Sequence, residues 1–305
     1  MTTIPPHDVL ELPDRHLPLD LDGGVPAIRR LYQRAVRGAW DPATDIPWNQ
    51  ADPDRYTEAE REAGRVYWSR RAWSEYGAIS ESPAMQLRYV LEGREADLSL
   101  FWAIRTQEEV RHAEVCARMA EALGGYHLQP SDQELKAIAG ALGTRDRVLN
   151  LAHPIEVTIA GLVCVAETVV YDVFLQLVRK VTDPIAKQIF RLILRDEVRH
   201  CEFGWEYLAH RVPHLNPDEH EACRQAMISM VQDVELAGYR SAWLAESPSA
   251  SEVEVDETVF RAGLGGVEQS WEAPIVVSSI RSIRERAATL GIDLPVFHHR
   301  LLGDI

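Results

Sequence analysis

Hydrophobic residues recur along most of the chain at the three- and four-residue spacing of an α-helix. No segment alternates hydrophobic and polar residues as a half-buried strand does, so the pattern predicts an all-α fold. Helices are predicted at Pro26–Gly38, Thr57–Glu92 with a kink at Pro83, Glu95–Leu123, Asp132–Gly143, Pro154–Val181, Pro184–Arg211, Pro217–Glu246 and Pro274–Leu290. Because several of these helices are long, we expect them to pack as a bundle.

Local signals mark where several of these helices begin. Thr57 and Glu60 have the spacing of a capping box, in which each side chain bonds to the backbone N–H of the other residue. Pro154, Pro184 and Pro217 fit first-turn positions, where the missing N–H of proline has no partner to lose.

The character of the chain divides it into three regions. Residues 1–56 are rich in proline, aspartate and glycine and are predicted to form an irregular extension that packs on the bundle. Residues 57–247 are predicted to form the bundle itself. Residues 248–305 are predicted to form a C-terminal loop and one helix, with Ser247–Gly266 as the linker or surface loop.

Charge and composition limit which partners the protein is expected to bind and where in the cell it is expected to occur. The chain carries 32 basic and 47 acidic residues, and 32 − 47 gives a net charge of −15. We therefore expect no nucleic-acid partner and no anionic membrane partner, since both need a basic surface. The N-terminal residues lack the pattern of a signal peptide, no stretch approaches the ~18 consecutive apolar residues of a membrane span, and the four cysteines form no Cys-x-x-Cys pair. A cytoplasmic location is the expectation.

The string Glu-Val-Arg-His occurs twice, once in each of two predicted long helices. It places Glu109 three residues before His112, and Glu197 three residues before His200. Residues three apart lie on one face of a helix, so a carboxylate and an imidazole can reach the same point. The repetition indicates an internally duplicated helix pair. Taken alone, the two strings also fit a surface of salt-bridged charges.

A duplicated pair requires a matching carboxylate on each preceding helix. In the second pair, Glu167 lies 15 residues before Thr182 and Glu197 lies 15 residues after it. At about 1.5 Å per residue both are roughly 22 Å from the turn, so they can face each other. Glu167 also stands in an apolar stretch, where an uncompensated carboxylate would be costly to bury. This favours a metal site over a salt-bridged surface.

The first pair leaves a choice between two glutamates. If Gly93 is the break, Glu109 lies 16 residues after it, Glu75 lies 18 before it and Glu81 lies 12 before it. Glu81 belongs to Ser-Glu-Ser-Pro, which is typical of a kink or cap. We therefore predict Glu75 as the ligand, with Glu81 as the alternative.

The residue types of the predicted glutamate and histidine ligands indicate which metal they bind. Four converging carboxylates repel one another unless cations neutralise them, and two divalent ions supply four positive charges. Carboxylate oxygens with one imidazole for each metal suit iron or manganese better than a structural zinc, which prefers thiolates. We expect two iron ions, and the same ligands also serve a mixed manganese–iron pair.

Two Glu-x-x-His motifs with a single Glu on each of two other helices resemble the ferritin-like di-iron carboxylate superfamily. The resemblance covers about Thr57–Arg211 and implies a ferritin-like four-helix bundle with extra flanking helices. Within it, Ser74–Ile79 and Gln107–Val115 are similar to the oxygenase branch, which includes bacterial N-oxygenases and multicomponent hydroxylases. Proteins of that branch usually have the motif Asp-Glu-x-Arg-His, in which the aspartate forms a hydrogen bond to a ligand histidine. Asp196 matches this position, and Glu108 stands at the equivalent position of the first motif.

The resemblance implies a di-iron oxygenase or oxidase that uses dioxygen to oxidise a small organic substrate by hydroxylation, N-oxygenation, desaturation or oxidative cleavage. A ferredoxin or flavin reductase would supply electrons, and a homodimer is a weaker expectation. Tyr171 and Cys164 are candidates for a pocket wall, because each lies within one helical turn of Glu167. The alternative is an iron-handling protein, a ferroxidase or peroxide scavenger without organic substrate.

Overall fold

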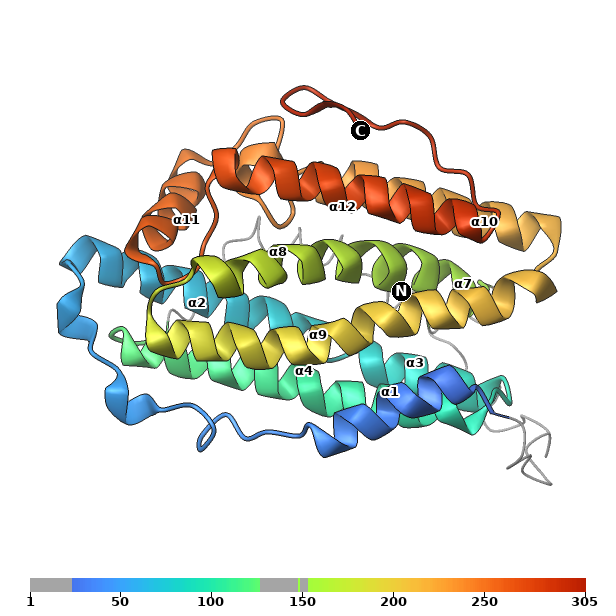
Figure 1. Cartoon of the computed structure of the whole chain (residues 1–305), viewed down its shortest axis with the longest axis horizontal. Coiled ribbons are helices and arrows are strands. Elements are labelled where there is room, and N and C mark those ends of the chain that lie inside the picture. Colours follow the sequence, from blue (N-terminus) through green and yellow to red (C-terminus); the bar gives the residue numbers. More distant parts are fainter. Residues whose placement is uncertain (1–23, 127–147, 149–152) are drawn as a thin grey trace, which may run out of the picture.

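The computed structural model describes residues 24–126, 148 and 153–305. Four long helical segments lie side by side within it (Figure 1). Their bounds are α2 (Glu58–Ala78), α4 (Ala96–Ala122), the continuous run of α7 (Ile155–Thr158), η3 (Ile159–Ala166) and α8 (Glu167–Lys180), and α9 (Pro184–Arg211). α2 packs on α4, α8 packs on α9, and α4 packs on α9. The fold is all-α, as predicted. The predicted helix Asp132–Gly143 lies outside the described residues.

The predicted helix starts are largely confirmed. Thr57 and Glu60 form both bonds of the capping box at the start of α2. Pro184 and Pro217 occupy first-turn positions, and the Asp183 side chain accepts a 2.8 Å hydrogen bond from the Ala186 N–H. Pro154 differs slightly, because it is the N-cap of α7 rather than its first residue.

The single helix predicted at Thr57–Glu92 is wrong. The chain turns at Ile79 and Ser80, between α2 and α3 (Glu81–Leu91). Pro83 lies inside the first turn of α3, where proline needs no N–H partner, so it does not cause the break. Gly93 is the predicted break before α4, and its φ of 62° suits glycine.

A π-helical segment interrupts the helix predicted at Pro154–Val181. It covers η3 and ends directly before Glu167. Gly204 of α9 lies against it, because a Cβ on Gly204 would come within 2.9 Å of the Val163 carbonyl carbon. The glycine therefore allows α9 to approach η3 closely. Hydrophobic periodicity predicts neither the π-helical segment nor this close approach of the two helices.

The remaining elements cover this bundle. α1 (Pro26–Arg37) packs on α4 and α9, α11 on α2, and α12 on α8, so that α12 lies above α8 and α1 below α9 in Figure 1. Their bounds, with those of the short 3₁₀ turns, the second π segment η5 and the terminal hairpin, are η1 (Trp48–Gln50), η2 (Pro53–Arg55), η4 (Val212–His214), α10 (Pro217–Ser229), η5 (Met230–Glu235), η6 (Ala242–Leu244), α11 (Ala250–Ala262), α12 (Gln269–Thr289), β1 (His298–His299) and β2 (Gly303–Asp304).

Three predictions for the C-terminal region need correction. The helix predicted at Pro217–Glu246 ends at Glu235, in the π segment η5. The loop predicted at Ser247–Gly266 contains α11, which Ser249 caps by accepting a hydrogen bond from the Glu252 N–H. The last helix begins at Gln269, so that Pro274 lies inside it. The two short antiparallel strands, paired His298 to Asp304, were not predicted.

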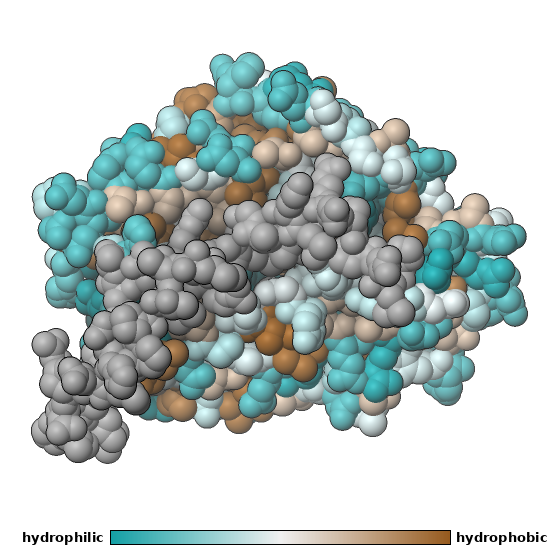
Figure 2. Space-filling view, turned by 180° about the vertical axis from the view of Figure 1, so that it is seen from behind, coloured by the Kyte–Doolittle hydropathy of each residue, from teal (hydrophilic) through white to brown (hydrophobic). Residues whose placement is uncertain are grey.

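Among the described residues, one helix, Ile155–Lys180, is long and apolar enough to cross a membrane by length and composition alone, although acidic residues interrupt its apolar sequence. However, 78% of its most apolar window is buried inside the bundle, as in the core helix of a globular protein. On the face opposite to Figure 1, the described hydrophobic residues form separate groups among hydrophilic ones (Figure 2).

Candidate metal centre

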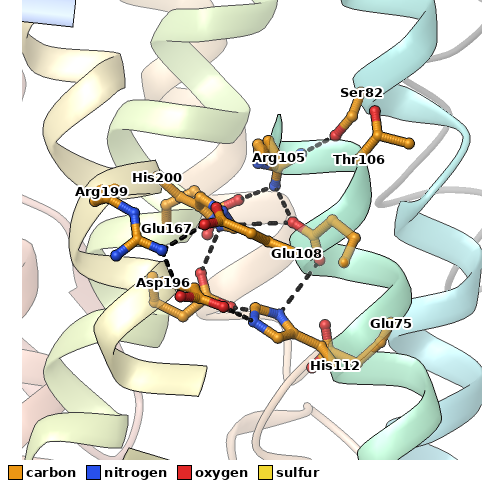
Figure 3. A network of polar contacts seen from close by, with 12 residues as sticks. Glu75, Ser82, Arg105, Thr106, Glu108, His112, Glu167, Asp196, Arg199 and His200 are labelled. Carbon is orange, nitrogen blue, oxygen red and sulfur yellow. Dashed lines mark hydrogen bonds and ion pairs between the residues drawn. The ribbon is translucent and has the colours of Figure 1, made fainter. Parts of the chain in front are cut away.

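The six predicted ligands come from the four bundle segments and converge in the interior. α4 supplies Glu109 and His112, and α9 supplies Glu197 and His200, each pair one turn apart on a single helix face. The other two, Glu75 from α2 and Glu167 from the start of α8, complete the set. Figure 3 shows the side chains of α4 and α9 facing one another across this space.

Donor atoms of these residues form two overlapping groups. One donor atom from each of Glu75, Glu109 and His112 lies within 4.8 Å of the others, and the same holds for Glu109, Glu167 and His200. Glu109 belongs to both groups. We name the first group position A and the second position B.

Glu197 spans the two histidines. Its Oε1 lies 3.5 Å from the His112 Nδ1, and its Oε2 lies 3.1 Å from the His200 Nδ1. A carboxylate in this place could help to hold a pair of metal ions. The structure therefore brings all six predicted ligands together.

The two histidines are held from behind by carboxylates of the opposite helix. The His112 Nε2 lies 3.3 Å from the Asp196 Oδ2, and the His200 Nε2 lies 2.9 Å from the Glu108 Oε2. Each helix thus orients the ligand of its partner, and both Nδ1 atoms point to the centre. Glu108 occupies the same kind of position as Asp196 despite its longer side chain.

Two arginines neutralise these two carboxylates, and a tryptophan forms a hydrogen bond to one of them. Arg199 binds both Glu108 and Asp196, and Arg111 lies 3.7 Å and 3.8 Å from them. Trp40 donates a 2.7 Å hydrogen bond from Nε1 to the Asp196 Oδ2. The N-terminal extension therefore contributes directly to the surroundings of the site.

Burial and charge perturb the acids and bases at the centre. Burial, with the neighbouring Glu167, raises the pKa of Glu197 to about 7. Burial also works to raise the pKa of Glu109, but Arg105 and the histidines outweigh it and hold that pKa at about 2. Burial would lower the pKa of His200, but Glu197 and Glu108 raise it to about 10. The site has an excess of negative charge that cations stabilise.

These residues fit a pair of metal ions. The His112 Nδ1 is buried, faces the carboxylates and has no hydrogen-bond partner, which is costly unless an ion binds it. Carboxylate oxygens together with one imidazole nitrogen at each position suit iron or manganese.

Arg105 is the residue that sequence reasoning missed. Its Nη2 lies 2.9 Å from the Glu109 Oε1 and 2.5 Å from the Glu167 Oε1. Its Nη1 donates a 2.8 Å hydrogen bond to the Ser82 hydroxyl. The available signal was its place four residues before Glu109 in a helix with large apolar neighbours, where a buried arginine needs an acidic partner.

The alternative ligand Glu81 has a different role. It is fully buried at the start of α3, but it belongs to neither position A nor position B. Its charge helps to raise the pKa of Arg105, together with the larger contributions of Glu109 and Glu167. The structure therefore favours Glu75 as the α2 ligand.

A cavity of about 1020 Å³ reaches the centre from the side of α2, α8 and α10. Among its walls are Glu75, Glu109 and Glu167. Apolar side chains of α8 form another part, namely Val169, Val170, Val173, Phe174 and Leu177. A small organic molecule inside it would lie beside the carboxylates.

The predicted pocket residues Tyr171 and Cys164 are not among its walls, which corrects the prediction. Tyr171 lies about 40° beyond Glu167 around the helix, on the side away from Val170 and Val173. Cys164 lies in the π segment, where residues three apart do not share a face as they do in an α-helix. It lies near Cys201 of α9 instead.

This fold and this arrangement of carboxylates and histidines define a ferritin-like helical bundle. A variant of an R2-like ligand-binding oxidase with an aerobically reconstituted Mn/Fe cofactor superposes with a TM-score of 0.69 and 17% identity, covering 85% of this chain and 93% of that one. An R2-like ligand-binding oxidase with a reconstituted metal cofactor after photoconversion gives a TM-score of 0.68 and 16% identity, covering 85% and 92%. No protein-family model matches the sequence, and no curated protein matches it either. The chain shares the fold of these oxidases.

Proposed function

We propose that the protein is a dinuclear metal oxidase or oxygenase that uses dioxygen to oxidise a small organic molecule. One observation carries the proposal. Two histidine Nδ1 atoms face four glutamates at the end of a cavity of about 1020 Å³. The ferritin-like fold, shared with R2-like ligand-binding oxidases that carry reconstituted Mn/Fe cofactors, supports it.

Two iron ions, or one manganese and one iron, would be held by Glu75, Glu109, His112, Glu167, Glu197 and His200. When bound, the metal pair supplies the redox chemistry that activates dioxygen. Glu109 and Glu197 face both positions and would hold the ions together. Asp196 and Glu108 keep each histidine Nε2 occupied, so that each Nδ1 is directed to a metal.

The cavity supports an organic substrate rather than iron alone. A centre that only handles iron has no need for an apolar wall of this length along α8. A molecule bound along this wall would lie beside Glu75 and Glu167. The structural neighbours are ligand-binding oxidases, which agrees with this use of the space.

Net insertion of one oxygen atom requires two electrons from outside. We therefore also propose a ferredoxin or a flavin reductase as donor. Hydroxylation, N-oxygenation, desaturation and oxidative cleavage all suit the site, and a cytoplasmic homodimer is the proposed setting.

The test is anaerobic loading with Fe(II), metal analysis, and stopped-flow absorption after mixing with dioxygen. We expect about two irons per chain and a transient visible band that decays faster with one member of a panel of small aromatic and aliphatic substrates. Oxidation followed by mineral formation, with no substrate effect, would indicate iron handling instead. Protein without stoichiometric metal would overturn the proposal.

A further inference from the structure

Arg105 is a buried cation placed among the proposed ligands. It is almost fully enclosed, and an arginine keeps its charge at every accessible pH. Its Nη2 contacts Glu109 and Glu167, which are the two glutamates of position B. The guanidinium group therefore lies on the same oxygens that a metal ion at this position would use or adjoin.

The two oxygens of Glu109 are divided between the two positions. Its Oε1 lies 2.9 Å from the Arg105 Nη2 and 3.5 Å from the His200 Nδ1, so this oxygen faces position B. Its Oε2 lies 3.7 Å from the His112 Nδ1, so this oxygen faces position A. Arg105 thus competes for the oxygen on one side only.

An arginine also lies beside position A, but it contacts fewer of the proposed ligands than Arg105 does. The Arg71 Nη2 contacts one ligand, the Glu75 Oε1, at 2.7 Å. Its guanidinium carbon lies 4.6 Å from the centre of the Phe174 ring, towards the cavity. The His112 Nδ1 of this position makes no hydrogen bond, although carboxylate oxygens of Glu197 and Glu109 lie 3.5 Å and 3.7 Å from it. Position A is therefore ready for an ion, while position B holds an internal cation.

We propose that Arg105 makes the two metal positions unequal, so that position A fills first and position B binds its ion more weakly. This inference rests on the proposed dinuclear site. Arg105 acts as a positioning residue, because it restricts which oxygens of Glu109 and Glu167 are free and repels a second cation. Like charges this close repel strongly in a site shielded from water, so the affinities differ by at least about tenfold.

The experiment is titration of the full chain with Mn²⁺ alone, in the absence of dioxygen, with free Mn²⁺ measured by EPR and heats measured by calorimetry. We expect wild-type protein to bind two ions with dissociation constants that differ by at least about tenfold. In Arg105→Gln the weaker constant approaches the stronger one. In Arg105→Lys, which keeps the charge, the inequality remains.

Two further variants show which metal position binds its ion tightly and which binds it weakly. Glu167→Gln changes position B only, so it removes the weak class and leaves the tight one. Arg71→Gln changes the surroundings of position A, so it alters the tight constant and leaves the weak one. Melting followed by circular dichroism verifies that each variant is folded.

The outcomes separate this inference from the proposed function. Wild-type protein that binds no Mn²⁺ stoichiometrically contradicts the dinuclear site itself. Two equal classes in wild-type protein, or an unchanged ratio in folded Arg105→Gln, overturns the role of Arg105 and leaves the dinuclear site standing. Two equal classes in wild-type protein overturn the role of Arg105 even if Arg105→Gln does not fold.

Discussion

Each ligand histidine is oriented by a residue that precedes a ligand glutamate on the other helix. Asp196 of α9 holds His112 of α4, and Glu108 of α4 holds His200 of α9. The bond to Nε2 fixes the ring and directs Nδ1 to the centre. Such outer carboxylates commonly change metal affinity by about 10- to 100-fold.

Asp196→Asn is therefore expected to weaken metal binding about 10- to 100-fold without unfolding the protein. The amide keeps the shape of the carboxylate, but it loses the charge that supports His112. Equilibrium dialysis with Mn²⁺ measures the change. Asp172→Asn, on α8 and outside both metal positions, is the matched control and leaves affinity unchanged. Equal affinity in Asp196→Asn and wild-type protein would show that the ring is held by packing alone.

Glu197 contacts both histidines, whereas Glu81 belongs to neither position. We expect Glu197→Ala to bind less than one metal per chain, because both positions lose a donor. Glu81→Ala keeps two. Metal analysis after iron loading and desalting provides the measurement. Full occupancy in Glu75→Ala together with loss in Glu81→Ala would reverse the assignment of the α2 ligand.

At the scale of elements, the approach of α9 to η3 positions Glu167 relative to Glu197. Gly204 is in contact with the backbone of Val163, where no larger side chain fits. The π segment ends one residue before Glu167, so its register decides where that carboxylate points.

Gly204→Ala is expected to destabilise the protein by about 1–3 kcal/mol, because the added methyl group must displace η3 or α9. The gain in helix propensity, about 1 kcal/mol, offsets only part of this cost. Denaturant unfolding monitored by circular dichroism provides the value. Ala209→Ser, at an exposed position of the same helix, is the control. An unchanged or raised midpoint for Gly204→Ala would mean that the two segments separate easily.

At the scale of the whole molecule, buried acids make stability depend on pH. Glu272 of α12 accepts hydrogen bonds from the Ser241 hydroxyl and the Trp243 indole N–H, and so joins α12 to the turn before α11. Burial raises the pKa of Glu272 to about 7, above 4.5 for a free glutamate. Between these two values the unfolded chain releases the proton and the folded chain keeps it. Stability is therefore lost as the pH rises through this window.

Glu272→Gln is expected to remove this loss, which amounts to at most about 3 kcal/mol. The variant should lose less stability than wild-type protein between pH 5 and pH 8 (~3 pH units), although it sacrifices one hydrogen bond worth about 1 kcal/mol. Melting temperatures across this range test the expectation. Glu285→Gln, exposed on the same helix, is the control. Parallel pH profiles for Glu272→Gln and wild-type protein would contradict it.

The all-α fold and the six proposed ligands could be predicted from local spacing, with Glu81 left as the alternative to Glu75. A helix puts Glu109 and His112 on one face wherever that helix lies, and the short turn before Pro184 sets Glu167 level with Glu197. Local spacing does not predict where the backbone departs from a regular α-helix, as it does at the turn after α2 and in η3.

The surroundings of the ligands depend on tertiary packing, which local spacing does not predict. The crossed bonds of Asp196 and Glu108, and the approach of Arg105 to Glu167, depend on how far each helix is rotated about its axis. That rotation results from packing over the whole interface, including the glycine contact between α9 and η3. Periodicity records which face of a helix is buried, but it does not record which residue of another helix that face meets.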